Sequence, residues 1–354
     1  MSRGQKIGEG CCTPRRNRLS MKKKLLVTSY YAEKNIKSAL ERLDGLAEIN
    51  RISLGRKATV KEMIGYLSGV YFVIMSDDAM DSVVISSANS LRMIGCDGVG
   101  VDSVDLIAAT NKGIIVVNAP EVHEANGDFT LGLIIALVRK IVFSDRDLRA
   151  DRWNQRHRFV GMGLSGKVLG LLGFGRAAKN VAKKANAFGF NILAYSRNPD
   201  AKIAKKLGVE LVGYEKLLKT SDILSIHVPL TGETRGMLDS RSFFMMKAGS
   251  YLINTSRGAI IDELSLIRAL KEGKISGAAL DVLTEEPPPM DLQLLDFNNV
   301  IITPHIASDS GDAFNGVFRS LVDDFILLNN SKIPKHIMNP EVLRHSNCSF
   351  LVDG

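Results

Sequence analysis

Cysteine, tryptophan and proline are scarce in this chain of 354 residues, which contains four, one and ten of them respectively. Cys11 and Cys12 lie near the start while Cys96 and Cys348 are isolated, so no disulfide framework can be drawn. With 45% hydrophobic and 24% charged residues, the composition is that of an ordinary folded protein and excludes a disordered or fibrous one. We therefore expect reduced thiols and a cytoplasmic location.

Long hydrophobic runs are absent as well. The strongest apolar stretches, Val70–Met75 and Leu131–Val138, are far shorter than the roughly 18 to 20 residues that a membrane-spanning helix needs. The histidines show no metal-ligand spacing on a plausible helix. The sequence therefore predicts neither a membrane-spanning segment nor a bound metal.

Positive charge is abundant but confined to one end. The net charge is +8, and eight basic residues between Met1 and Lys24 stand against Glu9 alone, so this segment carries seven of the eight net charges. The near-neutral remainder has no electrostatic footprint for a nucleic acid. Residues 1–20 lack the patterns of a signal or transit peptide, so we expect a disordered leader there.

The rest of the chain alternates short apolar runs with helical patterns, which is typical of βαβ units around a parallel sheet. One series of runs ends near residue 120, and a second begins at Val168 after a helix expected over Asp128–Ile141. The strands are almost wholly apolar, as in sheets covered on both faces. We predict an α/β protein with two doubly wound parallel-sheet domains, at 21–120 and 121–309.

A dinucleotide-binding turn is the first functional signal. Gly173, Gly175 and Ala178 form a G-x-G-x-x-A pattern between an apolar strand, Val168–Leu172, and a helix. The glycines permit a tight turn and close approach of a pyrophosphate, and the helix N-terminus supplies N–H groups to it. This arrangement predicts a nicotinamide dinucleotide cofactor.

The residues after the next strand bear on the choice of cofactor. An acidic residue there binds the ribose hydroxyls of NAD, but this chain has Ser196 followed by Arg197. A hydroxyl and a guanidinium suit a 2′-phosphate, so we predict a preference for NADP. The alternative is that Arg197 points into solvent and that NAD is accepted too.

Three polar residues follow later apolar strands, at the end of a parallel sheet where ligands bind. Arg257 provides a planar cation that can hold a carboxylate and polarise a neighbouring carbonyl. His305 can donate a proton, and Glu286 beside it would favour the imidazolium. Together they suit reduction of a 2-keto acid.

At this point the sequence resembles the D-isomer-specific 2-hydroxyacid dehydrogenases, from about Leu25 to Pro340. The resemblance implies that Arg257, Glu286 and His305 are the catalytic set, that Val99 and Gly100 bind the substrate carboxylate, and that Asp281 holds the nicotinamide carboxamide. Together with the glycine turn and the residues after the next strand, it gives an expected cofactor site of Gly173, Gly175, Arg176, Ala177, Ser196, Arg197, Pro229, Thr234, Ser256, Asp281 and Ala307, in which Ser196 departs from the acidic residue usual in the family. The motifs that carry the resemblance are Gly98–Asp105, Gly170–Ala178, His227–Gly236, Ile253–Gly258, Leu280–Pro287 and Thr303–Ala307.

The resemblance also implies a flavodoxin-like substrate domain completed by residues 310–340, a Rossmann domain and a homodimer. Asn126-Gly-Asp128 stands where many members have Val-Ala-Glu, which is a departure from the family at the start of the connecting helix. Asp77 and Asp78 stand where phosphoglycerate dehydrogenases have an Arg-Ser pair, and Glu286 stands where formate dehydrogenases have Gln. Phosphoglycerate and formate are therefore disfavoured, and a small 2-keto acid such as glyoxylate or hydroxypyruvate remains.

Two alternatives stay open from the sequence. Some relatives of this fold are nucleotide-sensing transcriptional corepressors, and these can retain the same Arg, Glu and His; turnover separates the two functions. Trp153 is expected to pack within the fold, although it could instead reach a substrate pocket across a dimer.

Overall fold

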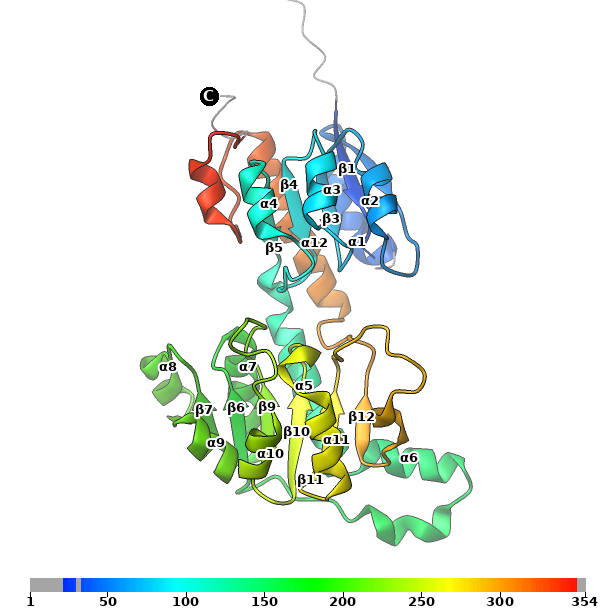
Figure 1. The fold of residues 1–354 in the computed structure, drawn as a ribbon, viewed down its shortest axis with the longest axis vertical. Helices are drawn as coiled ribbons and strands as arrows, with labels where there is room; N and C mark the ends of the chain where they lie inside the picture. Colours follow the sequence, from blue (N-terminus) through cyan, green and yellow to red (C-terminus); the bar gives the residue numbers. More distant parts are fainter. Residues whose placement is uncertain (1–21, 30–32, 349–354) are drawn as a thin grey trace, which may run out of the picture.

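Two parallel β-sheets, each covered by helices, organise the chain (Figure 1). The structure is a computed structural model, and it describes residues 22–29 and 33–348; the expected leader at 1–20 lies outside them. Both sheets contain only parallel pairings. The predicted fold class, with two doubly wound parallel sheets, is confirmed.

The first sheet has five strands in the order β2-β1-β3-β4-β5, which is the flavodoxin-like order. Two of its interior strands, Val70–Met75 and Met93–Cys96, are almost wholly apolar and buried, because helices cover both faces of the sheet. The strands are β1 (Lys23–Val27), β2 (Ala47–Arg51), β3 (Val70–Met75), β4 (Met93–Cys96) and β5 (Ile115–Asn118). The helices between them are α1 (Glu33–Leu40), α2 (Val60–Tyr66), α3 (Ser82–Ser87) and α4 (Leu106–Asn111).

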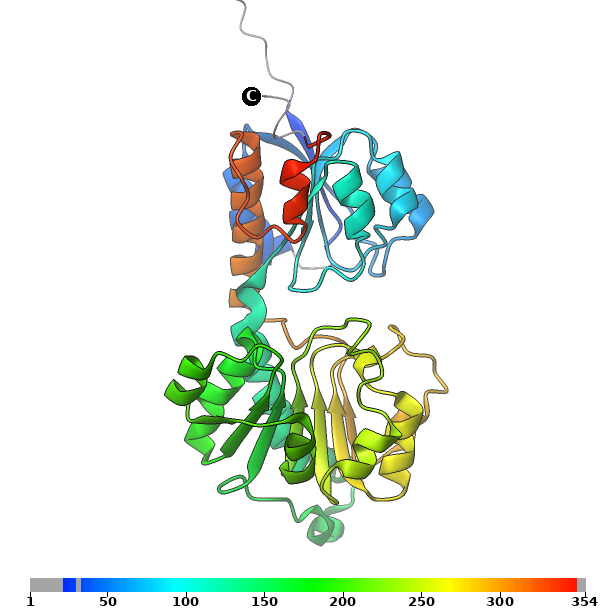
Figure 2. The ribbon, with the colours of Figure 1, turned by 60° about the vertical axis from the view of Figure 1, so that its left-hand side comes forward.

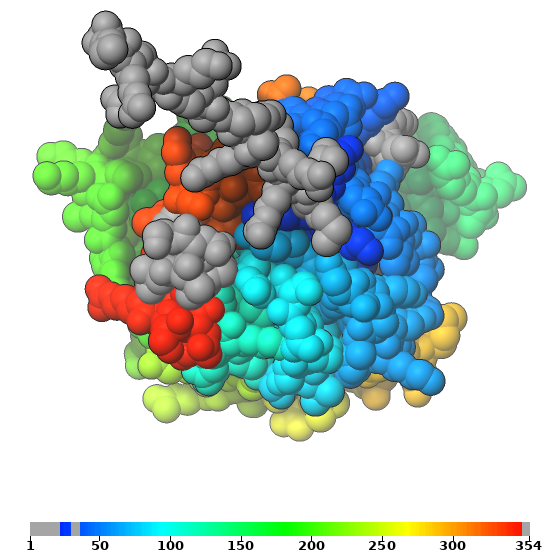
Figure 3. All heavy atoms as spheres, turned by 90° about the horizontal axis from the view of Figure 1, so that it is seen from above, coloured from blue at the N-terminus to red at the C-terminus, as the bar shows by residue number. Residues whose placement is uncertain are grey.

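The C-terminal helix α12 (Gly311–Asn329) packs against this first sheet. Phe318, Leu321 and Phe325 are fully buried, and the Phe325 ring stacks on Phe72 of β3 with 5.5 Å between ring centroids. The segment that follows lies beside α4, where the Asn339 amide donates to the Thr110 hydroxyl (Figure 3, red beside cyan). Residues far apart in the sequence therefore share one core.

The second sheet has seven strands in the order β12-β11-β10-β9-β6-β7-β8, a Rossmann order with an additional strand. The strands are β6 (Val168–Leu172), β7 (Asn191–Tyr195), β8 (Val209–Leu211), β9 (Ile223–Ile226), β10 (Ser250–Asn254), β11 (Ile275–Leu280) and β12 (Val300–Ile302). The helices are α7 (Arg176–Ala185), α8 (Ala201–Lys206), α9 (Tyr214–Thr220), α10 (Ser240–Met245) and α11 (Glu263–Lys271). The order reverses between β6 and β9, where such sheets bind ligands.

The connecting helix differs from the expectation. Helix α5 spans His123–Val138, so it begins five residues before the predicted start and contains Asn126-Gly-Asp128. Gly127 is compatible with the helix because it allows close contact with α7: a Cβ there would lie 3.0 Å from the Asn180 Cβ. The helix ends earlier than predicted, because Lys140 adopts a left-handed φ of 60° before a separate helix, α6 (Ile141–Arg149).

The expectation for Trp153 is wrong within this chain. It lies in the 3-10 segment η3 (Trp153–Phe159) after α6, and 63% of its surface is exposed. Phe143 of α6 and Phe159 of η3 pack against the core of the second domain, but no hydrophobic cluster of the described residues contains Trp153, and both segments protrude at the end of that domain (Figure 1). An indole this exposed contributes little to the packing of the monomer.

Candidate active site

The carboxyl ends of the two sheets point toward one another, and the candidate residues follow those ends (Figure 2). Arg257 follows β10, while Glu286 and His305 follow β11 and β12. The Asn254 side chain fixes the first of these loops: its amide donates to the Arg257 carbonyl at 2.9 Å and its oxygen accepts from the Ser256 N–H at 3.0 Å. Neighbouring parallel strands therefore deliver the three residues to one place.

His305 and Glu286 form a hydrogen-bonded pair. The distance from His305 Nδ1 to Glu286 Oε2 is 2.7 Å, and Glu286 Oε1 accepts from the Leu283 N–H at 2.8 Å. The hydrogen bond to Glu286 raises the pKa of His305, against the opposing effects of burial and of the Arg257 charge. Burial alone would raise the pKa of Glu286, but the bond and charge of His305 lower it. The pair therefore favours an imidazolium that can donate a proton.

Asp281 holds the backbone around His305. Its carboxylate is 1% exposed and accepts from the Thr303 hydroxyl at 2.6 Å, the Ile306 N–H at 3.0 Å and the Ala307 N–H at 2.8 Å. His305 itself has a φ of 55°, a conformation that a non-glycine residue keeps only when its surroundings impose it. Asp281, for which the resemblance implies a contact with nicotinamide, thus also shapes the loop that presents His305.

Arg257 contacts the opposite domain. Its Nε donates to Asp102 Oδ2 at 2.8 Å, and its Nη1 donates to the Ser256 carbonyl at 2.7 Å. A Cβ at Gly100 would lie only 1.6 Å from Nη2 of this arginine. The guanidinium therefore lies against the Gly98–Gly100 loop, where the substrate carboxylate is expected.

The glycine turn has the shape that a pyrophosphate needs. Gly173 has a φ of 104°, and a Cβ there would lie 2.7 Å from the carbonyl carbon of His227, so only glycine fits. Around Gly175 a Cβ would meet nothing within 4 Å, and no side chain caps α7, which begins at Arg176. The first N–H groups of α7, at Arg176 and Ala177, thus lie at an open cradle for an anion.

The loops beside the turn contain the remaining expected cofactor residues. Thr234 is buried and donates to the Pro229 carbonyl at 2.6 Å, while the Ser256 hydroxyl donates to the Val228 carbonyl at 2.5 Å. Ser196 and Arg197 follow β7. The Arg197 guanidinium forms an ion pair with Glu233, and both side chains are mostly exposed. The arginine is therefore already partnered, by a carboxylate that sequence reasoning missed.

The first domain contributes further carboxylates at the same edge. Asp77 pairs with Lys57 at 2.7 Å, and the charge of Lys57 also helps to lower the pKa of Glu286. Asp78 is buried and accepts from the Ala58 N–H at 2.7 Å, so of the two aspartates that disfavour a phosphate only Asp77 is exposed. Sequence reasoning missed Lys57, because the residue lies in an irregular segment where no strand or helix pattern predicts its position.

Asp97 is a second carboxylate that sequence reasoning missed. It is 6% exposed, directly precedes the Gly98–Gly100 loop and accepts from the Ser76 hydroxyl at 2.7 Å. Burial raises its pKa to about 7. Its position directly after β4 was a usable signal, because ligands bind at the carboxyl ends of such strands.

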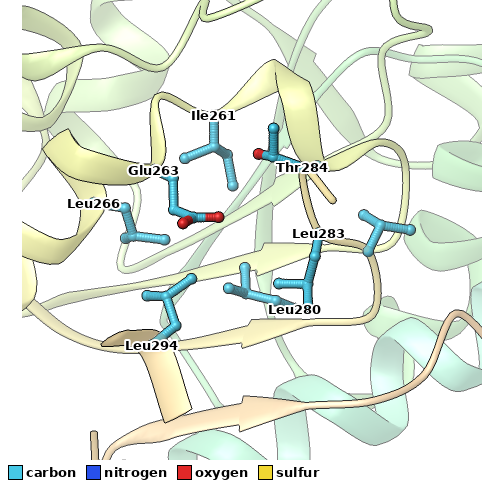
Figure 4. Close-up of a pocket in the computed structure, with 9 residues that line it drawn as sticks. Ile261, Glu263, Leu266, Leu280, Leu283, Thr284 and Leu294 are labelled. Carbon is cyan, nitrogen blue, oxygen red and sulfur yellow. The ribbon is translucent and has the colours of Figure 1, made fainter. Parts of the chain in front are cut away.

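A small cavity lies behind the Arg257 loop (Figure 4). Its lining is apolar except for Glu263 and Thr284, and burial raises the pKa of Glu263. Its volume of about 10 Å³ holds at most about one water molecule. This cavity is too small for a substrate. In the described ranges, no group of three potential ligand side chains could hold a metal, and no helix has the length and apolarity to cross a membrane.

Comparison with known proteins shows which sequences and folds this chain is similar to. Residues 131–307 match the family model "D-isomer specific 2-hydroxyacid dehydrogenase, NAD binding domain". The chain is 36% identical over 312 residues to a D-3-phosphoglycerate dehydrogenase of Archaeoglobus fulgidus, covering 88% of this chain but 58% of that protein. It is 39% identical over 281 residues to the glyoxylate reductase of Thermococcus litoralis, covering 77% and 85%. The crystal structure of the TT0316 protein of Thermus thermophilus superposes with a TM-score of 0.82 at 34% identity, covering 89% and 99%.

The fold and the matched domain define an oxidoreductase that uses a nicotinamide cofactor. The chain belongs to the D-isomer specific 2-hydroxyacid dehydrogenase family.

Proposed function

We propose that this protein is an NADP-dependent reductase that interconverts a small 2-keto acid and the corresponding D-2-hydroxy acid. The observation that carries the proposal is the His305–Glu286 hydrogen bond of 2.7 Å, with the charge of Arg257 close enough to oppose the raised pKa of His305. Glyoxylate and hydroxypyruvate are the favoured substrates. One of the relatives above is named glyoxylate reductase, which supports this choice.

Each residue then has a defined task. When bound, the reduced nicotinamide supplies a hydride to the carbonyl carbon. Arg257 holds the substrate carboxylate and polarises the carbonyl, with the backbone at Val99 and Gly100 on the other side. His305 donates a proton to the carbonyl oxygen, and Glu286 keeps the imidazole charged and oriented.

The preference for NADP rests on Ser196 and Arg197 after β7. A hydroxyl at the position of the usual carboxylate removes the repulsion of a 2′-phosphate. The Arg197–Glu233 pair is exposed, and such pairs contribute little, so a phosphate can displace Glu233 at small cost. NAD remains usable, because the glycine turn serves both cofactors.

Asp77 and Lys57 support a small, unphosphorylated substrate. The carboxylate of Asp77 neutralises Lys57 at 2.7 Å and leaves no free cation of that pair for a phosphate. Two relatives named D-3-phosphoglycerate dehydrogenase nevertheless share 36% and 40% identity with this chain, so phosphohydroxypyruvate belongs in the substrate panel.

A homodimer is the assembly we propose. Apolar side chains are exposed along α6 and η3 and just beyond them, including Leu148 at 53%, Trp153 at 63% and Val160 at 84%. Exposed apolar groups gathered on a protruding segment are typical of an interface. Sedimentation equilibrium of the protein and of Trp153→Ala tests this assembly, and a monomeric wild type would refute it.

The test of function is oxidation of NADPH and NADH, followed at 340 nm, with glyoxylate, hydroxypyruvate, pyruvate, phenylpyruvate and phosphohydroxypyruvate. We expect faster turnover with NADPH and with the two small keto acids. Arg197→Ala should lose the preference for NADPH and keep activity with NADH. Cofactor binding without turnover on any keto acid would instead point to a nucleotide-binding module.

A further inference from the structure

An ion pair joins the catalytic arginine to the opposite domain. Arg257 follows β10 of the second sheet, whereas Asp102 lies in the loop after β4 of the first sheet, 155 residues earlier. The Nε of Arg257 donates to Asp102 Oδ2 at 2.8 Å. The two domains thus contact each other through Arg257, which has a role in the proposed reaction.

The donors of Arg257 are divided between protein and substrate. A guanidinium has five N–H groups. Nε is used by Asp102 and one N–H of Nη1 by the Ser256 carbonyl. Nη2 lies against Gly100, at the expected site of the substrate carboxylate. Asp102 and Ser256 therefore use two of the five donors and hold the guanidinium in one orientation, which leaves three N–H groups, two of them on Nη2, for a substrate.

The pair contributes little to folding stability. The Arg257 and Asp102 side chains are 31% and 47% exposed, and ion pairs with this exposure have small effects on stability. The pair does restrict the position of the guanidinium, because the long Arg257 side chain, which has several rotatable bonds, is held at both Nε and Nη1.

We propose that Asp102 is a positioning residue that orients Arg257 from the substrate domain, so that the arginine is correctly placed only when the two domains are together. This inference rests on the proposed function, because it assigns Asp102 a role toward the substrate carboxylate. In a competing role, Asp102 would bind Arg257 in place of the substrate. Removal of Asp102 would then strengthen substrate binding, whereas the positioning role predicts that it weakens binding.

The same loop provides a matched control. Asp105 has the same charge and lies three residues further on, but its carboxylate caps α4 by accepting from the Ala108 N–H at 2.9 Å. Asp105→Ala therefore removes one carboxylate from the same loop without touching Arg257. The variants to compare are Asp102→Ala, Asp102→Asn, Asp105→Ala, Arg257→Ala and the double variant of Asp102 and Arg257.

Oxamate is the probe, because it has the carboxylate of a small keto acid but is not reduced. Its dissociation constant is measured by calorimetry with each variant saturated with NADPH, alongside KM and kcat for glyoxylate. We expect Asp102→Ala to weaken oxamate binding and raise KM roughly 10- to 100-fold, with NADPH affinity unchanged. Asp102→Asn, which keeps an acceptor oxygen, should recover part of the loss. In the Arg257→Ala background, removing Asp102 should change nothing further.

Three results would overturn the inference. Tighter oxamate binding by Asp102→Ala would show competition instead of positioning. An equal loss in Asp105→Ala would indicate a general effect of the loop, and an undiminished loss in the Arg257→Ala background would indicate a role independent of the arginine. If the wild type binds oxamate but reduces no keto acid, the proposed function fails while the oxamate series still decides the role of Asp102.

Discussion

The two sheets meet at their carboxyl ends, yet they supply different chemistry. The second sheet provides Arg257, Glu286 and His305 together with the glycine turn at Gly173. The first provides a glycine loop and several carboxylates, among them Asp97, which is buried next to that loop. In the proposed function, one domain thus holds the groups that react, and the other holds groups that orient the substrate.

The two domains differ in whether side chains or backbone face the candidate site. In the second domain, hydrogen bonds within that domain fix the loops of the candidate side chains, such as the three bonds that Asp281 accepts from the loop of His305. In the first domain the loop at Gly100 presents backbone, with no side chain between it and Arg257. Substitutions should therefore reduce the rate constant in one domain and substrate affinity in the other.

The largest effect is expected at His305. His305→Gln removes the proton donor but keeps a polar side chain, so kcat for keto-acid reduction should fall about 10²- to 10⁴-fold, while NADPH affinity stays the same. Steady-state kinetics and a fluorescence titration of NADPH measure the two. His157→Gln, on the exposed segment η3, is the control and should retain activity. A decrease of less than tenfold in His305→Gln would contradict the assignment of His305.

A pair of glycine substitutions contrasts the two domains directly. At Gly173 an alanine must adopt a φ of 104° and its Cβ would meet the His227 backbone at 2.7 Å, so Gly173→Ala should destabilise the fold by about 1–3 kcal/mol and abolish cofactor binding. At Gly100 the Cβ would meet only side chains, chiefly that of Arg257. Gly100→Ala should therefore fold normally, bind NADPH and show a KM raised at least tenfold. Thermal denaturation and NADPH titration compare the variants. A large loss of stability in Gly100→Ala would contradict the expectation that only the substitution at Gly173 disturbs the fold.

Glu286→Gln should move the pH profile more than it lowers the maximum rate. In the wild type the hydrogen bond to Glu286 raises the pKa of His305, so the imidazolium needed for reduction persists to higher pH and is lost as the pH rises through that value. Without the carboxylate the pKa falls, and the decline in kcat/KM with rising pH should begin at lower pH. Profiles from pH 5 to 9 for both proteins measure the displacement. A shift toward higher pH would contradict this role of Glu286.

Much of the second domain was predictable from the sequence. Strand β6 has the predicted limits, and in the first domain the apolar stretch Val70–Met75 coincides with β3, because continuous apolar runs mark strands buried on both faces. The turn at Gly173 was predictable since strand, glycines and helix follow one another without interruption. Arg257, Glu286 and His305 could be named because each directly follows an apolar strand or its loop, and the structure places them together.

Other elements had no such signal. Strand β2 lies at the edge of its sheet, is half exposed and has the sequence Ala-Glu-Ile-Asn-Arg, while β8 has only three residues. Neither forms an apolar run, so the sequence does not mark either segment as a strand. The ion pairs Arg257–Asp102 and Arg197–Glu233 depend on tertiary structure, because they join segments 155 and 36 residues apart. No local pattern specifies such partners.

Asp97 should give the first domain a measurable dependence of stability on pH. Its pKa is raised to about 7 by burial, whereas that of an unfolded aspartate is about 3.9, so the folded state binds the additional proton between these values. Stability should therefore fall as the pH rises from about 4 to 7, by roughly 1.4 kcal/mol for each unit of pKa difference. Asp97→Asn should flatten this part of the profile. Urea unfolding at pH 5 and pH 8 tests this, and an unchanged slope in the variant would show that Asp97 is ionised in the folded protein.

The smallest effect is expected at Glu233, which would affect the choice of cofactor under the proposed preference for NADP. Glu233 pairs with Arg197, and both side chains are more than 60% exposed, so the pair contributes about 0–1 kcal/mol. If a 2′-phosphate replaces this carboxylate, as proposed, Glu233→Gln should lower the KM for NADPH by up to about fivefold and leave that for NADH unchanged. The effect should shrink at high salt, since exposed charges are screened. Glu210→Gln, which removes the partner of Lys216 in another exposed pair, is the matched control. An equal gain for NADH would show that Glu233 acts on the shape of the loop and not on the phosphate.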